Sequence, residues 1–249
     1  MKRLEGKAAL VTGAAAGIGR ATALRLASEG ASLYLVDVAM DGLEETVALV
    51  EKEGAAVVGA RCDVSDDEDV KQNVAACVER FGRLDTLCNV AGILLLDHFP
   101  NISPDQFRRV LEVNLVGPFV LTQAALPHLI ETKGSIVNVS STSALAGMPY
   151  GAAYGTSKGG VSAFTRTIAV EFGKRGVRCN AVNPGSIQTS MMGPDVMPES
   201  VDMKLVMRAQ PLDESRPPEV VAAVIAMLAS EDGAHINGEE IRVDGGTLA

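Results

Sequence analysis

The chain has 249 residues, a length that one α/β domain commonly reaches, and no shift in composition marks a boundary between two domains. Apolar residues make up 47% of the sequence, which excludes an intrinsically disordered chain. The formal net charge of −9 comes without any basic cluster, so neither nucleic acid nor a membrane surface is an expected partner. We therefore expect a single domain over residues 1–249.

Cysteine and histidine residues are few and scattered. They are Cys62, Cys77, Cys88, Cys179, His98, His128 and His235. Because they form no CxxC pair or cluster, we expect neither a metal site nor a disulfide framework, and free thiols fit a reducing cytoplasm. The charged, glycine-broken start of the chain argues against a secretory signal, and no apolar run approaches the roughly 20 residues that a membrane span needs.

Seven short apolar runs, rich in β-branched residues, alternate with longer helix-like segments. Most of these runs do not alternate between apolar and polar residues, which is typical of parallel strands buried on both faces. The predicted strands are residues 7–12, 32–37, 56–61, 84–88, 134–140, 177–183 and 239–243. Repeated β-helix-β units with right-handed crossovers predict an α/β fold with a doubly wound, Rossmann-like parallel sheet of seven strands. Its ligands should bind at the carboxyl ends of the strands.

Two of the intervening segments carry helix-start signals. In SDDE, Ser65 is the predicted N-cap, with Glu68 three residues on. In SPDQ, Ser103 is the predicted N-cap, followed by Pro104 at the first helical position and by Gln106. Both capping boxes fall between predicted strands, as the alternating pattern requires.

The segment TGAAAGIG, residues 12–19, joins the first strand to a helix, the context in which a glycine loop cradles a pyrophosphate. Gly13 would allow the tight turn, Gly17 the close approach of a ligand, and Gly19 the close packing of helix on strand, with Ile18 between them. The spacing is GxxxGxG rather than the usual GxGxxG, and a strand-to-helix turn can need glycines for steric reasons alone. The loop therefore needs support from other residues.

Asp37, at the end of the second strand, supplies that support. A carboxylate there can accept hydrogen bonds from both hydroxyls of an adenosine ribose and would repel a 2′-phosphate, so NAD is favoured over NADP. Neither Val38 nor the alanines of the loop offer the positive charge that a phosphate would need. Taken alone, Asp37 could simply cap the following helix.

Other small and polar residues follow the third and fourth strands. Asp63 and Val64 are predicted to contact an adenine ring, by a polar edge contact and by packing. Asn89, Ala91 and Gly92 would form a floor of small residues for a ribose. Each of these residues alone is as readily a loop cap, but all lie at the carboxyl ends of consecutive strands.

Six motifs occur in order along nearly the whole chain: TGAAAGIG, NVAG (89–92), EVNLVG (112–117), VSS (139–141), YGTSK (154–158) and NPGSIQT (183–189). Together they make the chain resemble the short-chain dehydrogenase/reductase family. The resemblance implies an NAD(P)-dependent oxidoreductase of one Rossmann-like domain, usually a homotetramer, that acts on alcohols and ketones.

The resemblance also implies four catalytic residues, Asn114, Ser141, Tyr154 and Lys158. In that family the serine lies thirteen residues before the tyrosine, which selects Ser141 over Ser140. Tyr154 would be the acid/base, with its pKa lowered by the Lys158 ammonium one helical turn away. Ser141 would hold the substrate oxygen, Lys158 would also bind the nicotinamide ribose, and Asn114 would hold a proton-relaying water. Without this context, a tyrosine and a lysine four residues apart are an ordinary helix-surface pair.

The segment NPGSIQT follows the sixth predicted strand. Pro184 and Gly185 would shape the turn under the nicotinamide, while the Ile187 backbone and Thr189 would bond its carboxamide. The simpler interpretation is a proline-glycine turn that ends a strand.

Residues 190–213 interrupt the strand-helix alternation and contain five of the nine methionines. We predict a mobile substrate lid with an adaptable apolar wall, although a surface excursion ending in a packed helix is also consistent with the pattern. Other expected walls are residues 93–99 and 142–151. Tyr150, which we place near the start of the helix that carries Tyr154, is predicted to be one of these wall residues.

These walls are mostly apolar and contain no pair of basic residues for a carboxylate or phosphate. We therefore predict an NAD-dependent enzyme that interconverts a secondary alcohol and a ketone of apolar, alicyclic or steroid-like character. A 3-oxoacyl-[acyl-carrier-protein] reductase is the first alternative; Asp37 and the acidic balance weigh against it, whereas Arg175 keeps it open. A non-catalytic NAD-binding member of the family is the alternative of another class, but none of the four catalytic residues is missing.

Overall fold

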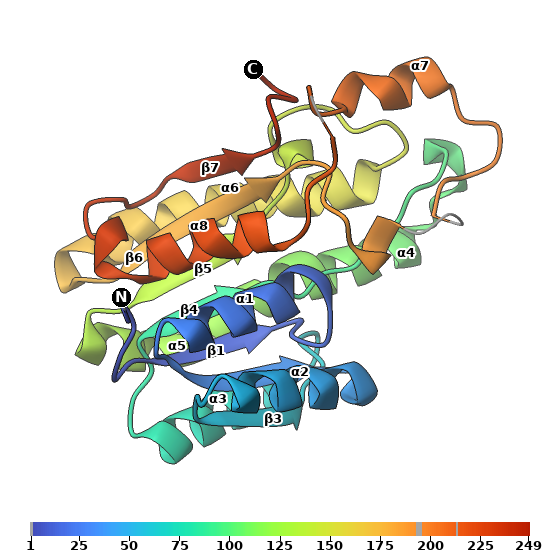
Figure 1. The fold of residues 1–249 in the computed structure, drawn as a ribbon. Helices are drawn as coiled ribbons and strands as arrows, with labels where there is room; N and C mark the ends of the chain where they lie inside the picture. Colours follow the sequence, from blue (N-terminus) through green and yellow to red (C-terminus); the bar gives the residue numbers. More distant parts are fainter. Residues whose placement is uncertain (1, 193–195, 213) are drawn as a thin grey trace.

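A parallel sheet of seven strands forms the centre of the computed structural model, which describes residues 2–192, 196–212 and 214–249. The strand order is β3-β2-β1-β4-β5-β6-β7 (Figure 1). The strands are β1 (Ala8–Thr12), β2 (Ser32–Asp37), β3 (Val57–Arg61), β4 (Thr86–Asn89), β5 (Ser135–Val139), β6 (Arg178–Pro184) and β7 (Glu240–Val243). Each begins and ends within two residues of a predicted strand. The prediction of a doubly wound, Rossmann-like parallel sheet is confirmed.

Helices cover both faces of this sheet (Figure 1). They are α1 (Gly17–Ser28), α2 (Met40–Lys52), α3 (Asp67–Phe81), α4 (Pro104–Leu111), α5 (Gly117–Thr132), α6 (Ala152–Phe172), α7 (Met203–Val206) and α8 (Glu219–Ala229). The buried side chains of α1, α2 and α8 belong to one apolar core. Buried side chains of α3 and α5, with Ala169 of α6, belong to a second core on the opposite face.

Successive residues of the strands supply the two cores in turn. In β2, Leu33 and Leu35 lie in the core with α1 and α8, whereas Tyr34 and Val36 lie in the core with α3 and α5. Because successive strand side chains point to opposite faces, a strand between two helical layers must be apolar at every position. This requirement explains the continuous apolar runs in the sequence.

One of the two predicted capping boxes is confirmed. Ser103 accepts a hydrogen bond from the Gln106 amide, and the Gln106 side chain accepts one from the Ser103 amide, with Pro104 starting α4. The box predicted at Ser65 is wrong, because Asp66 is the N-cap of α3. The Ser65 hydroxyl instead donates to Asp63, so the helix begins one residue later than predicted.

The longest helical run, Pro104–Thr132, joins α4 and α5 through a π-helical turn at Glu112–Val116. By length and hydropathy alone this run is sufficient to cross a membrane, although half of its most apolar stretch is buried inside the fold. Core helices pass the same test. Here α5 contributes Leu121, Ala125 and Leu129 to the core that it shares with α3 and α6.

The predicted lid segment, residues 190–213, contains α7 between the short 3₁₀ turns Ser190–Met192 and Met207–Ala209. Residues 193–195 and 213 of this segment lie outside the described residues. The α7 helix stands at one end of the molecule, beyond the carboxyl ends of the strands (Figure 1). The described part of this segment thus lies near the strand ends, and its role as a mobile lid stays a prediction.

Candidate active site

A cavity of about 420 Å³ opens at the carboxyl ends of β1, β4, β5 and β6. Its walls come from the loop after β1, residues 90–96, 139–149 and 184–191, the lid segment and the C-terminal Thr247 and Leu248. The strand order reverses between β1 and β4, and α/β sheets characteristically bind ligands at this point. A cavity thus lies where the predicted topology expects a ligand.

The glycine loop of this cavity is folded tightly on itself. Gly13 has a φ of +67°, and a Cβ atom there would lie 2.8 Å from the Ala91 Cα atom. A Cβ atom at Gly19 would lie 1.9 Å from the Gly13 carbonyl oxygen, so this glycine is needed for contact with the loop and not, as predicted, with the strand. The N-cap of α1, Ala16, has no capping side chain, which leaves the first amide groups of that helix available to an anion.

We expect Gly19→Ala to lower the free energy of unfolding by about 2 kcal/mol, because the loop must open to admit the methyl group. For a chain of this size the melting temperature should fall by roughly 4–8 °C. Gly159→Ala is the matched control: Gly159 also lies within a helix, but a Cβ atom there has no neighbour within 4 Å. This control should be neutral or stabilising, since alanine favours the helix. Equal melting temperatures for both variants would contradict the steric role of Gly19.

The carboxylate of Asp37 is held at the edge of the cavity by two backbone amides. One of its oxygens accepts from Ala15 at 2.9 Å and the other from Ala39 at 2.9 Å. Neither bond caps α2, whose N-cap is Ala39 without a capping side chain, so the capping interpretation is wrong, and each carboxylate oxygen keeps lone pairs for a further donor. The nearby cation Arg20 is occupied by the Glu45 carboxylate and by backbone carbonyls. Among the described residues that line the cavity, Asp37 and Lys158 carry the charged side chains.

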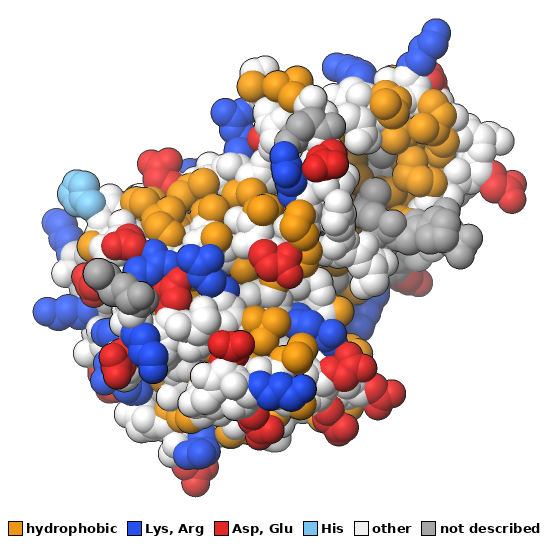
Figure 2. Space-filling model, in the orientation of Figure 1, with side chains coloured by type: hydrophobic (Ala, Val, Ile, Leu, Met, Phe, Trp, Pro, Cys, Tyr) orange, Lys and Arg blue, Asp and Glu red, His pale blue; other side chains and the backbone are white. Residues whose placement is uncertain are grey.

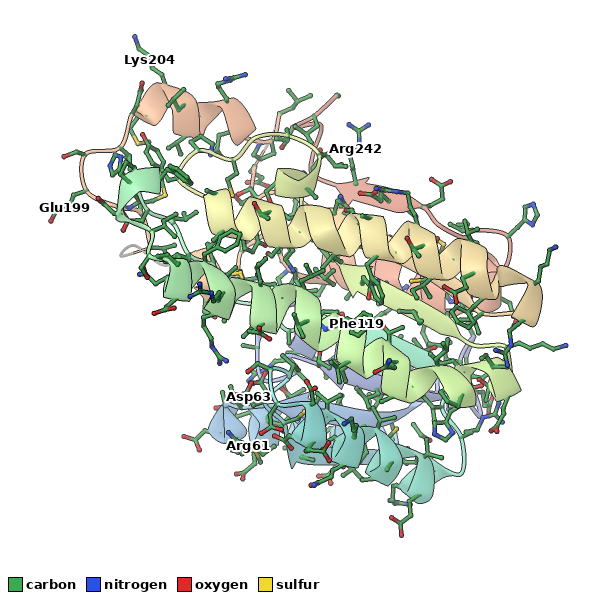
Figure 3. All side chains as sticks on the ribbon, turned by 180° about the vertical axis from the view of Figure 1, so that it is seen from behind. Arg61, Asp63, Phe119, Glu199, Lys204 and Arg242 are labelled. Atoms are coloured by element: carbon green, nitrogen blue, oxygen red, sulfur yellow. The ribbon has the colours of Figure 1, made fainter. Side chains whose placement is uncertain are left out.

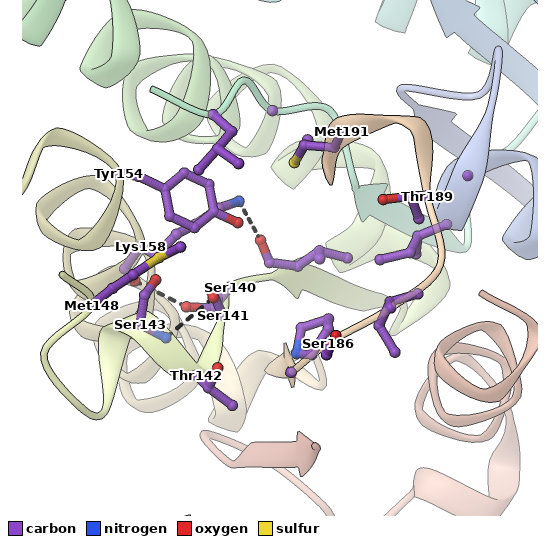
Figure 4. Close-up of a pocket in the computed structure, with 18 of the residues that line it drawn as sticks. Ser140, Ser141, Thr142, Ser143, Met148, Tyr154, Lys158, Ser186, Thr189 and Met191 are labelled. Carbon is purple, nitrogen blue, oxygen red and sulfur yellow. Dashed lines mark hydrogen bonds between the residues drawn. The ribbon is translucent and has the colours of Figure 1, made fainter. Parts of the chain in front are cut away.

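Ser141, Tyr154 and Lys158 meet on one side of the cavity (Figure 4). Tyr154 and Lys158 lie one turn apart on α6, and Ser141 follows β5. Lys158 is 4% exposed, and its Nζ atom donates to the Val139 carbonyl oxygen at 2.7 Å. The three side chains whose contact the sequence predicted are therefore brought together.

Burial has the largest effect on the pKa values of Tyr154 and Lys158. It lowers the pKa of Lys158 to about 8 and raises the pKa of Tyr154, while a hydrogen bond with Ser141 opposes the rise at Tyr154. The predicted lowering of the Tyr154 pKa is therefore wrong. The Lys158 Nζ atom lies over the face of the tyrosine ring, 5.7 Å from its centroid, and its own charge is disfavoured by burial.

Asn114 lies in the π-helical turn between α4 and α5 and is fully buried. Its Oδ1 atom accepts from the Ile93 amide at 2.8 Å, and its Nδ2 atom donates to the Ile93 carbonyl at 2.9 Å and to Ser157 at 3.1 Å. A Cβ atom at Gly92 would lie 3.3 Å from Asn114 and 3.5 Å from the Lys158 Nζ atom. Asn114 thus fixes the segment after β4 behind the lysine without lining the cavity.

Most of the predicted site residues line the cavity. They are Gly13, Gly17, Ile18, Gly19, Asp37, Ala91, Gly92, Ser141, Tyr154, Lys158, Pro184, Gly185, Ile187 and Thr189. The segment NPGSIQT thus contributes a cavity wall and not simply a turn.

Three predicted cofactor residues are not among the lining residues. The Asp63 carboxylate accepts from the amide and the hydroxyl of Ser65, beside Arg61 near the end of β3 (Figure 3). Val64 is 7% exposed, and its carbonyl oxygen would lie 2.7 Å from a Cβ atom at Gly117. Asn89 is buried within the sheet, where its Nδ2 atom donates to Asn138 of β5 at 2.8 Å. Each residue lies at the expected strand end, but its polar atoms are directed to other parts of the fold.

Tyr150 departs from its prediction as well. It precedes α6, which starts at Ala152, and its φ of +63° breaks the helix before that point. Its side chain does not line the cavity, so the predicted role as a pocket wall is wrong.

Some contributions at and beside the cavity were not predicted. The Thr12 hydroxyl accepts from the amides of Val90 and Ala91, both at 3.0 Å, and so joins the glycine loop to the end of β4. Thr247 and Leu248 reach the cavity from the end of the chain. The threonine lies in the TG pair of the loop and could have been found there, whereas no local signal marks the C-terminal residues.

Comparison with known proteins agrees with this geometry. Residues 13–247 match the family model described as enoyl-(acyl carrier protein) reductase. The 3-oxoacyl-[acyl-carrier-protein] reductase of Thermotoga maritima is 39% identical over 247 residues, which cover 99% of each chain. The meso-2,3-butanediol dehydrogenase of Serratia marcescens is 38% identical, over 99% of this chain and 96% of that one.

Solved structures are similar over the same length. A short chain dehydrogenase from Mycobacterium paratuberculosis bound to NAD has a TM-score of 0.92 at 32% identity, over 98% of both chains. A short chain dehydrogenase from Burkholderia cenocepacia in complex with NADP has a TM-score of 0.90 at 33% identity, over 99% of this chain and 100% of that one. Because the family model and these relatives match nearly the whole chain, the chain belongs to the short-chain dehydrogenase/reductase family of oxidoreductases.

Proposed function

We propose that the protein is an NAD-dependent oxidoreductase that interconverts a secondary alcohol and a ketone, with Tyr154 as the general acid/base. The observation that carries the proposal is that Ser141, Tyr154 and Lys158 share one cavity with the glycine loop and with Asp37. A dinucleotide site and a proton donor thus face the same space. A non-catalytic member of the family would have no need for this second element.

The residues present fit a nicotinamide dinucleotide. The uncapped start of α1 offers amide groups to a pyrophosphate, and Asp37 offers acceptor lone pairs to ribose hydroxyls. Lys158, Ile187 and Thr189 line the same cavity and would hold the nicotinamide ribose and carboxamide. When bound, the nicotinamide supplies the hydride donor or acceptor.

The protein's own part in the reaction is to position the substrate and to manage one proton. The Ser141 hydroxyl would bond the substrate oxygen, next to the Tyr154 phenol with which it already shares a hydrogen bond. Burial keeps Tyr154 protonated at neutral pH, the form that gives a proton to the oxygen of a ketone being reduced. In the oxidative direction, a protonated Lys158 would stabilise the phenolate that takes the alcohol proton.

The substrate part of the cavity supports an uncharged, largely hydrocarbon ligand. Its walls include Leu94, Leu96, Met148, Met191 and Met197, and the polar side chains there, such as Gln210 and Thr247, are neutral. Buried apolar surface would supply most of the affinity, and a few neutral groups would orient the substrate. An alicyclic or steroid-like alcohol or ketone fits these walls.

The relative in Thermotoga maritima keeps a 3-oxoacyl-[acyl-carrier-protein] reductase as the second candidate. Arg175 no longer supports this candidate. It follows the end of α6 that is far from Tyr154, roughly 30 Å away along the helix axis. Two other cations replace it: Lys204 and Arg208 are exposed on the lid, and Lys204 points away from the body of the molecule (Figure 3). An acidic carrier could contact them there.

A substrate screen decides between the two candidates. Purified protein would be assayed with secondary alcohols and their ketones, and with acetoacetyl thioesters, each with NAD and with NADP cofactors. NAD-linked turnover of alicyclic ketones supports the proposal, whereas NADPH-linked reduction of the thioesters alone contradicts it. NADH binding without turnover of any compound would identify a non-catalytic protein.

The cofactor preference has its own test. We expect Asp37→Ala combined with Val38→Arg to lower the ratio of kcat/KM for NAD to that for NADP by about 100-fold. The change removes the carboxylate that repels a 2′-phosphate, and places a cation at a position whose side chain is 55% exposed. Asp41→Ala is the control, since this exposed carboxylate on α2 does not line the cavity. An unchanged ratio in the double variant would remove Asp37 from cofactor selection.

We also propose a cytoplasmic homotetramer. The four cysteines are buried free thiols, and burial raises the pKa of each to about 12, which suits a protein kept in a reducing compartment. Light scattering of the purified protein measures the mass of the assembly.

A further inference from the structure

Two aromatic side chains outside the cavity contact the backbone of the lid segment. The Tyr150 hydroxyl accepts a hydrogen bond from the Asp202 amide at 2.7 Å. The His98 Nε2 atom lies 3.0 Å from the Glu199 carbonyl oxygen, a distance at which a protonated Nε2 donates. The two rings pack edge to face, with centroids 5.0 Å apart and planes at 72°.

The two aromatic residues are themselves fixed to each other through the backbone. The Asp97 amide donates to the Tyr150 carbonyl oxygen at 2.9 Å, and the Asp97 carboxylate accepts from the His98 amide at 2.7 Å. Tyr150 has a φ of +63°, a conformation that costs free energy for a bulky residue and persists only where its surroundings impose it. The left-handed turn directs the tyrosine ring to His98 and away from α6.

The lid has little else to hold it at this point. The four-residue helix α7 buries none of its side chains, and Met203, Leu205 and Met207 are 54%, 40% and 59% exposed. Figure 2 shows hydrophobic side chains gathered at this end of the surface. Within the described residues 196–206, the hydrogen bonds to the rest of the chain are those to Tyr150 and His98.

The contacted stretch lies between two side chains that form part of the cavity wall. Met197 precedes Glu199, Val206 follows Asp202, and both line the cavity. Because the chain between them is short, a displacement of residues 199–202 displaces these walls as well. The position of the wall over the substrate therefore depends on the aromatic pair.

We propose that Tyr150 and His98 are positioning residues that hold the lid over the cavity and thereby select substrates by their apolar bulk. The holding role depends on the hydrogen bonds and packing alone. The selection of substrates rests on the proposed function, since it requires an apolar alcohol or ketone against Met197 and Val206. The holding role and the selection of substrates can be measured separately.

The three tyrosines of the chain provide a matched set of variants. In Tyr150→Phe we expect the amide hydrogen exchange of residues 196–206, and of Asp202 above all, to become about tenfold faster. The KM of a bulky apolar ketone should rise about five- to tenfold, while kcat and the KM of a small ketone should stay within about twofold. His98→Phe, which keeps the ring and loses the donor, should accelerate exchange in the same segment.

Tyr34→Phe removes a buried hydroxyl that bonds Asn73 on the other side of the fold, so lid exchange and kinetics should be unchanged. Tyr154→Phe should abolish turnover and leave lid exchange unchanged. Unaltered exchange in Tyr150→Phe would overturn the holding role, and faster exchange with unaltered KM for bulky ketones would overturn the selection of substrates. If the wild-type protein turns over no compound, the proposed function fails, while hydrogen exchange still decides the holding role.

Discussion

Replacing Tyr154 by phenylalanine is expected to lower turnover of the preferred alcohol or ketone by about 1000-fold. The variant keeps the ring, which Lys158 covers at 5.7 Å, and loses the hydroxyl that bonds Ser141. The reacting oxygen would then have no side chain to exchange a proton with, because Ser141 holds its own proton far more tightly than a phenol does. Steady-state kinetics in both directions measures the loss.

Cofactor affinity separates a chemical role of Tyr154 from a structural one. Fluorescence titration of Tyr154→Phe with NADH should give a Kd within about threefold of the wild-type value, since the proposed dinucleotide site is formed mostly by the glycine loop, Asp37 and residues 184–189. Tyr150→Phe serves as the control with an intact Tyr154 and should keep its kcat. A Tyr154→Phe variant that retains most of its rate would remove this residue from the mechanism.

Lys158→Met is expected to abolish turnover and yet to stabilise the folded protein at neutral pH. Burial lowers the pKa of Lys158 to about 8 from the ordinary lysine value of 10.5. Below pH 8 both the folded and the unfolded chain carry the charge, and the folded protein bears the full cost of burying it. That cost is about 3 kcal/mol, from which the lost hydrogen bond to the Val139 carbonyl subtracts about 1–2 kcal/mol.

The sign of the pH dependence follows from the same shift. Between pH 8 and pH 10.5 the unfolded chain binds a proton that the folded protein has released, so wild-type stability rises with pH in this window. The advantage of Lys158→Met, measured by urea unfolding at pH 7 and at pH 9.5, should therefore shrink with rising pH. A difference between the two proteins that is constant over this range would show that Lys158 is not a buried cation.

Much of the fold could be predicted from the sequence, because the patterns that specify strands and helices are local. A strand buried on both faces is apolar over most of its length, and residues 8–11 of β1 and 33–36 of β2 form such uninterrupted runs. The glycine loop was found by residue type and spacing, and Ser141, Tyr154 and Lys158 by the resemblance of their motifs to the family; the fold then brought them together, since the carboxyl ends of neighbouring parallel strands share one edge. Sequence and topology together were sufficient for the candidate site.

Hydrogen-bond partners were harder to predict from the sequence, because a polar side chain at a strand end has several possible partners. Asn89 and Asp63 stand where a ligand contact was predicted, yet Asn138 and Ser65 occupy their polar atoms. Ser65 was likewise predicted to cap α3, and the nearby Asp66 took that place. Such competition depends on which atoms meet after folding, and no spacing rule contains it.

The sequence by itself determined the order of the strands and helices along the chain and the glycine loop, because both depend on residue type and spacing, whereas the assignment of Tyr154 as the acid/base rests on the family resemblance and stays a prediction. The tertiary structure alone decided the direction of the pKa shifts of Tyr154 and Lys158, because burial outweighs the attraction expected between neighbours on a helix. It also decided the place of Tyr150. A left-handed backbone at that residue turned the expected pocket wall outward onto His98 and the lid, where contacts between distant segments, and not helical spacing, fix its position.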